Sequence, residues 1–165
     1  MRATTHMYCL RFDSALADCQ EVCQLADETG RLRGAIISLN ISSQILLEKQ
    51  QYAQAEADAQ YALELVSRTG AKRFVPLFHD VLARVKFYHG GSAGAMKLLE
   101  ESWAIAEETS PTFAGPWILG AMALITQDFE FRRSSLAKGE ALLNKGCVAH
   151  NYFWFYRDAI EAKIG

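Results

Sequence analysis

Apolar residues recur along most of the chain at the three- and four-residue intervals that place them on one face of a helix. From Phe12 to Glu28 they form a single stripe, which stops before Gly30, where glycine readily adopts the left-handed conformation of a helix C-cap. The same pattern, interrupted by polar or glycine-containing turns, predicts further helices over residues 32–47, 52–68, 74–88, 92–108, 117–126, 131–145 and 151–163. Alternating runs of Val, Ile and Thr, which signal strands, are nearly absent. The pattern predicts an all-α protein.

The predicted helices repeat in pairs at an interval of forty residues. The segment Leu-Ala-Asp-Glu-Thr-Gly at 25–30 recurs as Leu-Val-Ser-Arg-Thr-Gly at 65–70 and as Ile-Ala-Glu-Glu-Thr-Ser at 105–110. One helix-pair unit used several times buries a continuous core by stacking on its neighbours. We therefore expect a single domain over residues 1–165, made of units at about 1–30, 31–70, 71–110 and 111–146 and a closing helix at 150–163. The first unit is either a shortened cap or the remainder of a longer one.

Small residues at the repeat interval resemble those of the tetratricopeptide repeat. The positions that match the small-residue columns of its second helix are Ala55, Ala59 and Ala62, then Ala15, Cys19 and Val22, then Ala95, Leu99 and Ser102. The interval here is longer than the roughly 34 residues of the standard motif, and the first-helix signature is poorer. The resemblance implies antiparallel helix pairs stacked as a right-handed superhelix, whose first helices line a concave groove for a protein or peptide partner.

Positions on the first helices that face such a groove are the first candidates for a binding site. Carried over from the resemblance, they are Asn40, Gln44 and Leu47 in the second unit, Leu77, Asp80, Arg84 and Phe87 in the third, and Trp117, Leu124 and Gln127 in the fourth. A purely structural role stays open for several of them. Asp80 and Arg84 have the i,i+4 spacing of a helical ion pair, and Leu47, Phe87 and Trp117 suit an ordinary core.

A second resemblance covers residues 146–161, which read Gly-Cys-Val-Ala-His-Asn-Tyr-Phe-Trp-Phe-Tyr-Arg-Asp-Ala-Ile-Glu. This stretch is similar to a segment of bacterial signalling proteins in which a helical-repeat region follows a nucleotide-cyclase-type domain and an ATP-binding regulatory domain. Neither catalytic domain occurs in this sequence. The resemblance implies a regulatory part of a bacterial signalling or transcription system.

The predicted last helix carries five consecutive aromatic residues, Tyr152, Phe153, Trp154, Phe155 and Tyr156. They fall all round the helix, whereas a helix at the surface normally has one apolar stripe. Such a helix is either enclosed by the core or packs against something beyond the chain, such as a second copy of the protein. Both outcomes stay open from the sequence, and a homodimer is one of them.

Charge and hydropathy narrow the classes of partner. The formal net charge is -2, and the basic residues are scattered, whereas nucleic-acid binding needs clustered Lys and Arg. The longest apolar stretch, 117–125, is too short to cross a bilayer, and residues 1–12 lack the apolar core of a signal peptide. We expect a cytoplasmic protein that binds neither nucleic acid nor membrane.

The sequence offers no recognisable catalytic or metal-binding set. Cys19 and Cys23 stand one helical turn apart but lack two further ligands with zinc-site spacing, and Cys19 occupies a small-residue column of the repeat. The glycines at 90–94 follow a predicted helix and suit a turn better than a phosphate loop. We therefore expect no enzyme, metal or cofactor, but a non-enzymatic protein–protein interaction module. The alternative is a small-molecule sensor that uses the same groove.

Overall fold

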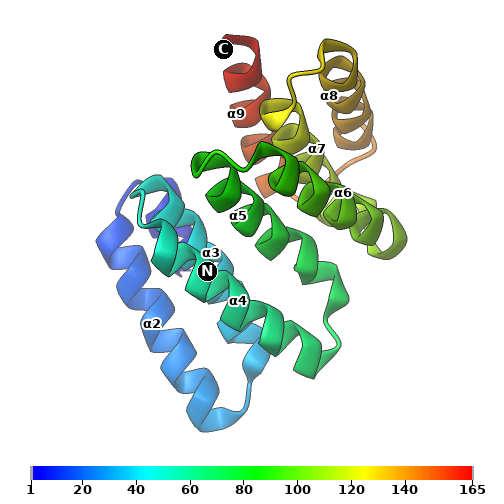
Figure 1. Cartoon of the computed structure of the whole chain (residues 1–165). Helices are drawn as coiled ribbons and strands as arrows, with labels where there is room; N and C mark the ends of the chain where they lie inside the picture. Colours follow the sequence, from blue (N-terminus) through cyan, green and yellow to red (C-terminus); the bar gives the residue numbers. More distant parts are fainter. Residues whose placement is uncertain (1, 165) are drawn as a thin grey trace. The chain divides into compact units, whose positions relative to one another are not determined.

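The computed structural model describes residues 2–164, and within them it contains nine α-helices, one short 3₁₀ turn and no strand (Figure 1). The elements are α1 (Arg2–Tyr8), α2 (Phe12–Thr29), α3 (Leu32–Glu48), α4 (Tyr52–Thr69), η1 (Lys72–Phe74), α5 (Val75–Tyr88), α6 (Ser92–Thr109), α7 (Pro111–Ile125), α8 (Phe129–Leu143) and α9 (His150–Ile164). The prediction of an all-α protein is confirmed. The chain divides into two compact units, Met1–Phe74 and Val75–Gly165, and the division falls just inside the third unit of the sequence repeat.

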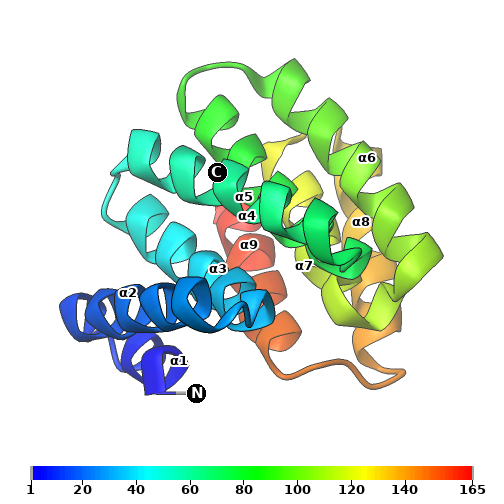
Figure 2. The same ribbon diagram turned by 90° about the horizontal axis from the view of Figure 1, so that it is seen from below.

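In the first compact unit, α3 lies between α2 and α4, and α1 packs against α2 (Figure 2). The small residues of the repeat stand at these helix contacts: Ala15, Ala55 and Ala59 have no exposed surface. Side chains of this size let two helix backbones approach closely, and bulkier aliphatic residues of α3, such as Ile36 and Ile45, fill the remaining space. The small-residue columns therefore do what the repeat pattern predicted.

Glycines in the left-handed conformation end the first and second sequence units. Gly30 and Gly70 have φ values of +70° and +65°, which close α2 and α4 at nearly the predicted positions. Gly90, at φ +82°, closes α5 in the same way. As a result Gly91 takes the N-cap position of α6, without a side-chain cap, and Ser92 is the first residue of the helix.

In the second compact unit, α7 is the central helix, with α8 and α9 on its two sides and α5 and α6 packed against it (Figure 1). The sequence predicted that this helix begins at Trp117, and that start is wrong. The helix begins at Pro111, because a proline at the first helical position lacks only an N–H that would have no partner there. A second proline, Pro116, lies inside the helix.

Apolar packing in this unit forms two clusters. The larger joins α6 and α7 through residues such as Leu99, Ile118 and Met122. The smaller surrounds Phe155 of α9, whose ring lies so close to α8 that a Cβ atom at Gly139 would stand 2.2 Å from Phe155 Cε2. Over residues 2–164, no helix combines the length and the apolar character that a membrane crossing requires.

Candidate functional site

Three helices of the second unit converge on a buried ion network. Asp80 and Arg84 lie one turn apart on α5, and Asp158 lies on α9; the side chains of the two acids have no exposed surface, and that of Arg84 has 4 %. Arg84 Nε donates to both carboxylate oxygens of Asp80 at 3.0 Å. Its Nη1 and Nη2 donate to the two oxygens of Asp158. One guanidinium therefore bridges two carboxylates on two different helices, the fork geometry for which arginine is suited.

Two more groups complete the network. Trp117 of α7 donates its indole N–H to Asp80 Oδ2 at 3.0 Å. Arg157 donates twice to Asp158 Oδ1, at 2.9 and 2.8 Å, and supplies the second positive charge. Burial by itself would lower the pKa of Arg84, but the charges of Asp158 and Asp80 outweigh it and hold that pKa well above its ordinary value. With two carboxylates and two guanidinium groups, the formal charges balance.

An aromatic layer lies beside these charges. The rings of Trp117 and Trp154 are stacked, with centroids 5.0 Å apart and planes 17° from parallel. Arg157 lies over the ring of Trp154, with its guanidinium carbon 4.3 Å from the ring centroid. The ring of His150 meets Trp117 nearly edge-on, at 5.8 Å. The arrangement fixes α9 against α7 by polar and apolar contacts together.

Asn151, near the start of α9, supplies hydrogen bonds to backbone groups of α7. Pro116 has no N–H to donate to the carbonyl of Thr112, so that carbonyl loses its helical partner. Asn151, which has no exposed surface, donates its amide to the carbonyls of Thr112 and Phe113 at 3.3 and 2.8 Å. Its Oδ1 accepts from the backbone N–H of Trp117 at 3.4 Å. A buried carbonyl left unpaired would cost free energy, so Asn151 makes the proline tolerable.

Sequence reasoning missed Asn151, Arg157 and Asp158 as a set. The available signal was the spacing of Asn151 and Asp158, which are seven residues apart in a helix rich in aromatic residues and so share one face. Their partners are far away in the sequence, Asp158 being 74 residues from Arg84. No local pattern indicates a contact at such a separation.

The groove candidates of the second compact unit, Val75–Gly165, fall into two groups. Asp80, Arg84 and Trp117 come together in the interior, and the ion pair that their spacing allowed is confirmed. Leu77 is also buried, while Phe87 and Leu124 are half-buried and Gln127 is exposed. Phe87 packs against the larger apolar cluster. Only the last three side chains offer surface to a partner.

The groove candidates of the first compact unit, Met1–Phe74, all lie on α3 and are mostly enclosed. Gln44 and Leu47 are 2 % and 7 % exposed, so Leu47 belongs to the core, as the structural alternative held. Asn40 is half-buried, and its side-chain oxygen has no hydrogen-bond partner. In this unit Asn40 is the one groove candidate with accessible surface among the three.

The aromatic run of α9 divides between core and surface. Trp154 and Phe155 are 5 % and 0 % exposed, whereas Tyr152, Phe153 and Tyr156 expose 41 %, 57 % and 45 % of their surface. The core therefore encloses two of the five aromatic residues, and contact of the exposed ones with another molecule stays a prediction. A self-association surface, if α9 has one, consists of the exposed residues and excludes Trp154 and Phe155.

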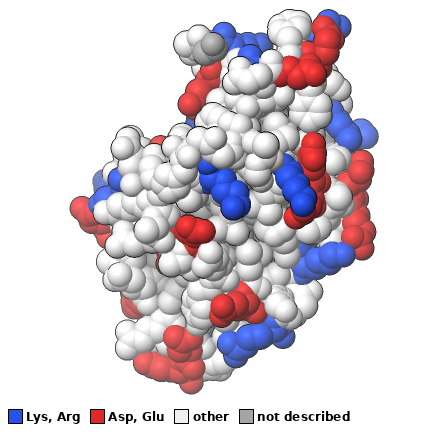
Figure 3. Space-filling model, viewed as in Figure 1, with Lys and Arg blue, Asp and Glu red and all other residues white. Residues whose placement is uncertain are grey.

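Other reactive side chains stay isolated. Cys19 is 2 % exposed, and burial raises the pKa of its thiol to about 12, so it behaves as a small apolar residue. Within residues 2–164, no three His, Cys, Asp or Glu side chains stand close enough to hold a metal ion. On the face shown in Figure 3, positive and negative side chains are interspersed with wide uncharged areas.

Comparison with known proteins adds no family. A scan against protein-family models finds no match for the chain, and a search of curated proteins finds none either.

Proposed function

We propose that this chain is a non-enzymatic protein–protein interaction module built from tetratricopeptide-like helix pairs. The forty-residue recurrence of helix pairs supports it, because repeats of this kind usually serve as binding surfaces. A regulatory role in a bacterial signalling or transcription system is proposed on the resemblance of residues 146–161 alone.

The exposed apolar stripe of α9 carries the proposal. Phe153, Tyr156 and Ile160 follow one another at helical spacings and are 57 %, 45 % and 59 % exposed. Contiguous exposed apolar side chains on a folded surface mark a contact with another molecule. The opposite face of α9 is held by the Arg84 network and by Asn151, so the stripe stands on a fixed support. Rigid support lowers the entropy cost of binding.

We propose a second copy of the chain as the partner of this stripe. Glu161 and Lys163 are exposed beside it and bring one charge of each sign to the same helix. A two-fold interface pairs a patch with itself, so a helix that bears both signs can complement its own copy. Groups of both signs at the rim would also set the direction of the paired helices.

Molar mass in solution tests this proposal. Size-exclusion chromatography with light scattering, over a dilution series, is expected to show twice the 18.4 kDa chain mass at high concentration. Phe153→Asp with Ile160→Asp is expected to give the single-chain mass at every concentration. Tyr61→Asp, at an exposed aromatic residue of α4, is the control and keeps the dimer. A wild-type chain that is monomeric throughout, or a double variant that still dimerises, would contradict the proposal.

A small-molecule sensor is the second candidate, favoured by a hollow of about 430 Å³ in the first unit between α2, α3 and α4. Its lining includes Gln20, Ser42 and Asp58, and burial raises the pKa of Asp58 above its ordinary value. The volume lies in the range of small-molecule sites. A metabolite screen by thermal unfolding is expected to find a ligand that raises the melting temperature of the wild type but not of Asp58→Leu. No shift across the screen would reject the sensor.

A further inference from the structure

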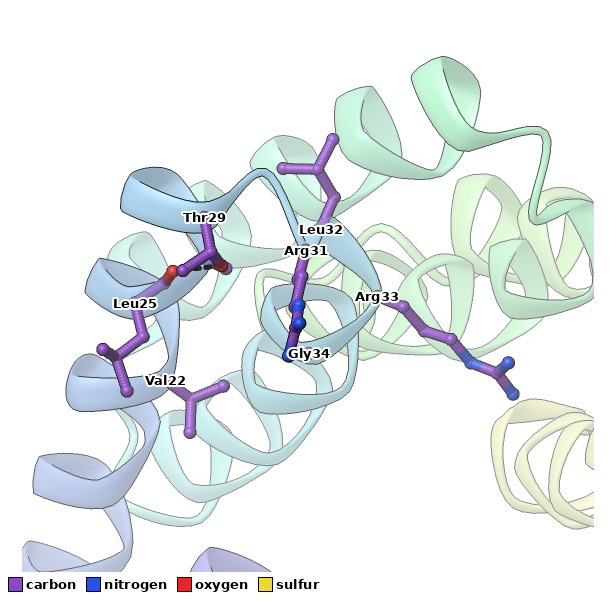
Figure 4. A pocket seen from close by; sticks show the side chains of 8 residues that line it. Val22, Leu25, Thr29, Arg31, Leu32, Arg33 and Gly34 are labelled. Atoms are coloured by element: carbon purple, nitrogen blue, oxygen red, sulfur yellow. Dashed lines mark hydrogen bonds between the residues drawn. The ribbon is translucent and has the colours of Figure 1, made fainter.

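A second hollow opens on the first compact unit, at the turn between α2 and α3 (Figure 4). Its volume is about 680 Å³. Val22 and Leu25 line it from α2, and Leu32 and Gly34 line it from α3. Val22 and Leu32 are half-buried and Leu25 is 49 % exposed, so apolar side chains face solvent here. Exposed apolar surface in a concave place is a property of binding sites.

The units of the sequence repeat differ near this hollow in one residue type and in the exposure of another residue. Gly34 and Leu25 correspond, forty residues on, to Phe74 and Leu65. Phe74 lies in η1, which packs against α4, and is 6 % exposed, while Leu65 is 1 % exposed. The third unit of the sequence repeat thus has an aromatic residue at the position where the second unit has a glycine. A Cβ atom at Gly34 would stand 3.3 Å from Val22 Cγ1, closer than an ordinary van der Waals contact, so a side chain at this position would push Val22 aside.

Two positive side chains stand at the rim of this hollow. Arg31 extends beside Gly34, and Arg33 extends from the other side of the α3 start (Figure 4). Both are exposed, and neither makes a hydrogen bond or an ion pair through its side chain within residues 2–164. The first turn of α3 has no acidic residue to balance them. The nearest acids in the sequence, Asp27 and Glu28, belong to the last turns of α2 and do not line the hollow.

We propose that this hollow binds an acidic segment of a partner protein that inserts one bulky apolar side chain. The apolar group, best an aromatic ring, would rest on Val22 and Leu25, which lie side by side in Figure 4. A carboxylate next to it would pair with Arg31. Arg33 would add attraction to further acidic residues and speed association. The inference rests on the proposed interaction function and assigns it a partner chemistry at a site separate from α9.

Selection from random peptides tests the chemistry. The full chain, immobilised, is panned against a displayed library of random dodecapeptides. The enriched peptides are expected to hold Phe, Trp, Tyr or Leu within a few residues of Asp or Glu. A selected peptide is then synthesised with a fluorophore, and its dissociation constant is measured by fluorescence polarisation.

Two variants and two matched controls locate the binding. Gly34→Phe places an aromatic ring against Val22 at the hollow, and Arg31→Glu reverses the charge at the rim. Each is expected to weaken the binding of the peptide at least about tenfold, or 1.4 kcal/mol. Gly94→Phe makes the same change at an exposed helical glycine of α6, and Arg68→Glu makes the same charge change near the end of α4. Both controls keep the wild-type affinity. Because Arg31 is exposed, its variant remains informative if Gly34→Phe fails to fold.

Three results would overturn the inference: no enrichment of any peptide, enriched peptides without the acidic and apolar combination, or equal affinity for wild type and Arg31→Glu. The α9 variant Phe153→Asp with Ile160→Asp separates this site from the proposed function. It is expected to lose the dimer and to keep the peptide affinity. Loss of peptide binding in that variant would place the peptide on α9 and reject the hollow.

Discussion

At the scale of single residues, the second unit depends on charges that have no access to water. Arg84 is enclosed between Asp80 and Asp158, and their side chains have no more than 4 % exposed surface. Breaking a buried ion pair by removing one partner is strongly destabilising, because the charge that remains is buried with less compensation. Part of this network was predictable: the spacing of Asp80 and Arg84 indicates an ion pair. Asp158 was not, because its partner is 74 residues away.

Replacing Arg84 by methionine is therefore expected to lower the free energy of unfolding by about 3–5 kcal/mol, because two buried carboxylates lose their shared partner. Arg157→Met is the control. The Arg157 side chain is 27 % exposed and leaves Asp158 still paired with Arg84, so its effect is expected to be much smaller. Urea unfolding followed by circular dichroism measures both. Equal effects of the two variants would show that Arg84 is not the centre of the network.

His79 of α5 predicts a dependence of stability on pH. Burial lowers its pKa below the ordinary value, and its Nδ1 is buried without a partner. The unfolded chain then binds the proton more readily than the folded one, so stability is present above about pH 6.5 and falls as the pH drops. The melting temperature is expected to fall between pH 7.5 and 5.5, and to fall less in His79→Gln. The same change at exposed His89 is the control, and an identical pH slope in all three proteins would reject the assignment.

At the scale of elements, the sequence predicts the end of a helix wherever a glycine in the turn stops it. The predicted ends of α2 and α4 lie within one residue of those observed, because Gly30 and Gly70 stop both helices. The prediction failed at the start of α7, which was expected at Trp117 and lies at Pro111. Pro111 serves as a helix start, and Pro116 is accommodated by Asn151 from α9. A tertiary contact overrides a local preference there, and only the structure reveals it.

The contact between α8 and α9 depends on a missing side chain. Gly139→Ala would ordinarily stabilise a helix, by up to about 1 kcal/mol. Here its Cβ would stand 2.2 Å from the Phe155 ring, so the variant is expected to lose about 1–3 kcal/mol. Phe155→Leu in the same chain is expected to recover part of that loss. Gly94→Ala, at an open helical position, should stabilise the protein; a stabilising Gly139→Ala would contradict the packing.

At the scale of the whole molecule, the repeat and the all-α class were readable from the chain, but the use of each surface was not. The sequence shows five aromatic residues in α9 without showing which ones the core encloses. Enclosure depends on α7 and α8, which pack on one face of α9 and leave Phe153 and Tyr156 in solvent. The same limit explains why the sequence analysis assigned Asp80, Arg84 and Trp117 to a groove, whereas they lie in the interior of the second compact unit. Periodicity identifies a face of a helix but not its neighbour.

Hydroxyl-radical footprinting of the wild-type chain tests the central claim most directly, since it reads the exposure of each aromatic side chain without any substitution. The claim is that the α9 stripe contacts a second molecule. Labelling of Phe153, Tyr156 and Ile160 is expected to fall as the protein concentration rises, while labelling of exposed Tyr61 of α4 stays constant. Unchanged labelling of the stripe up to the highest concentration, or equal protection at Tyr61, would contradict the account.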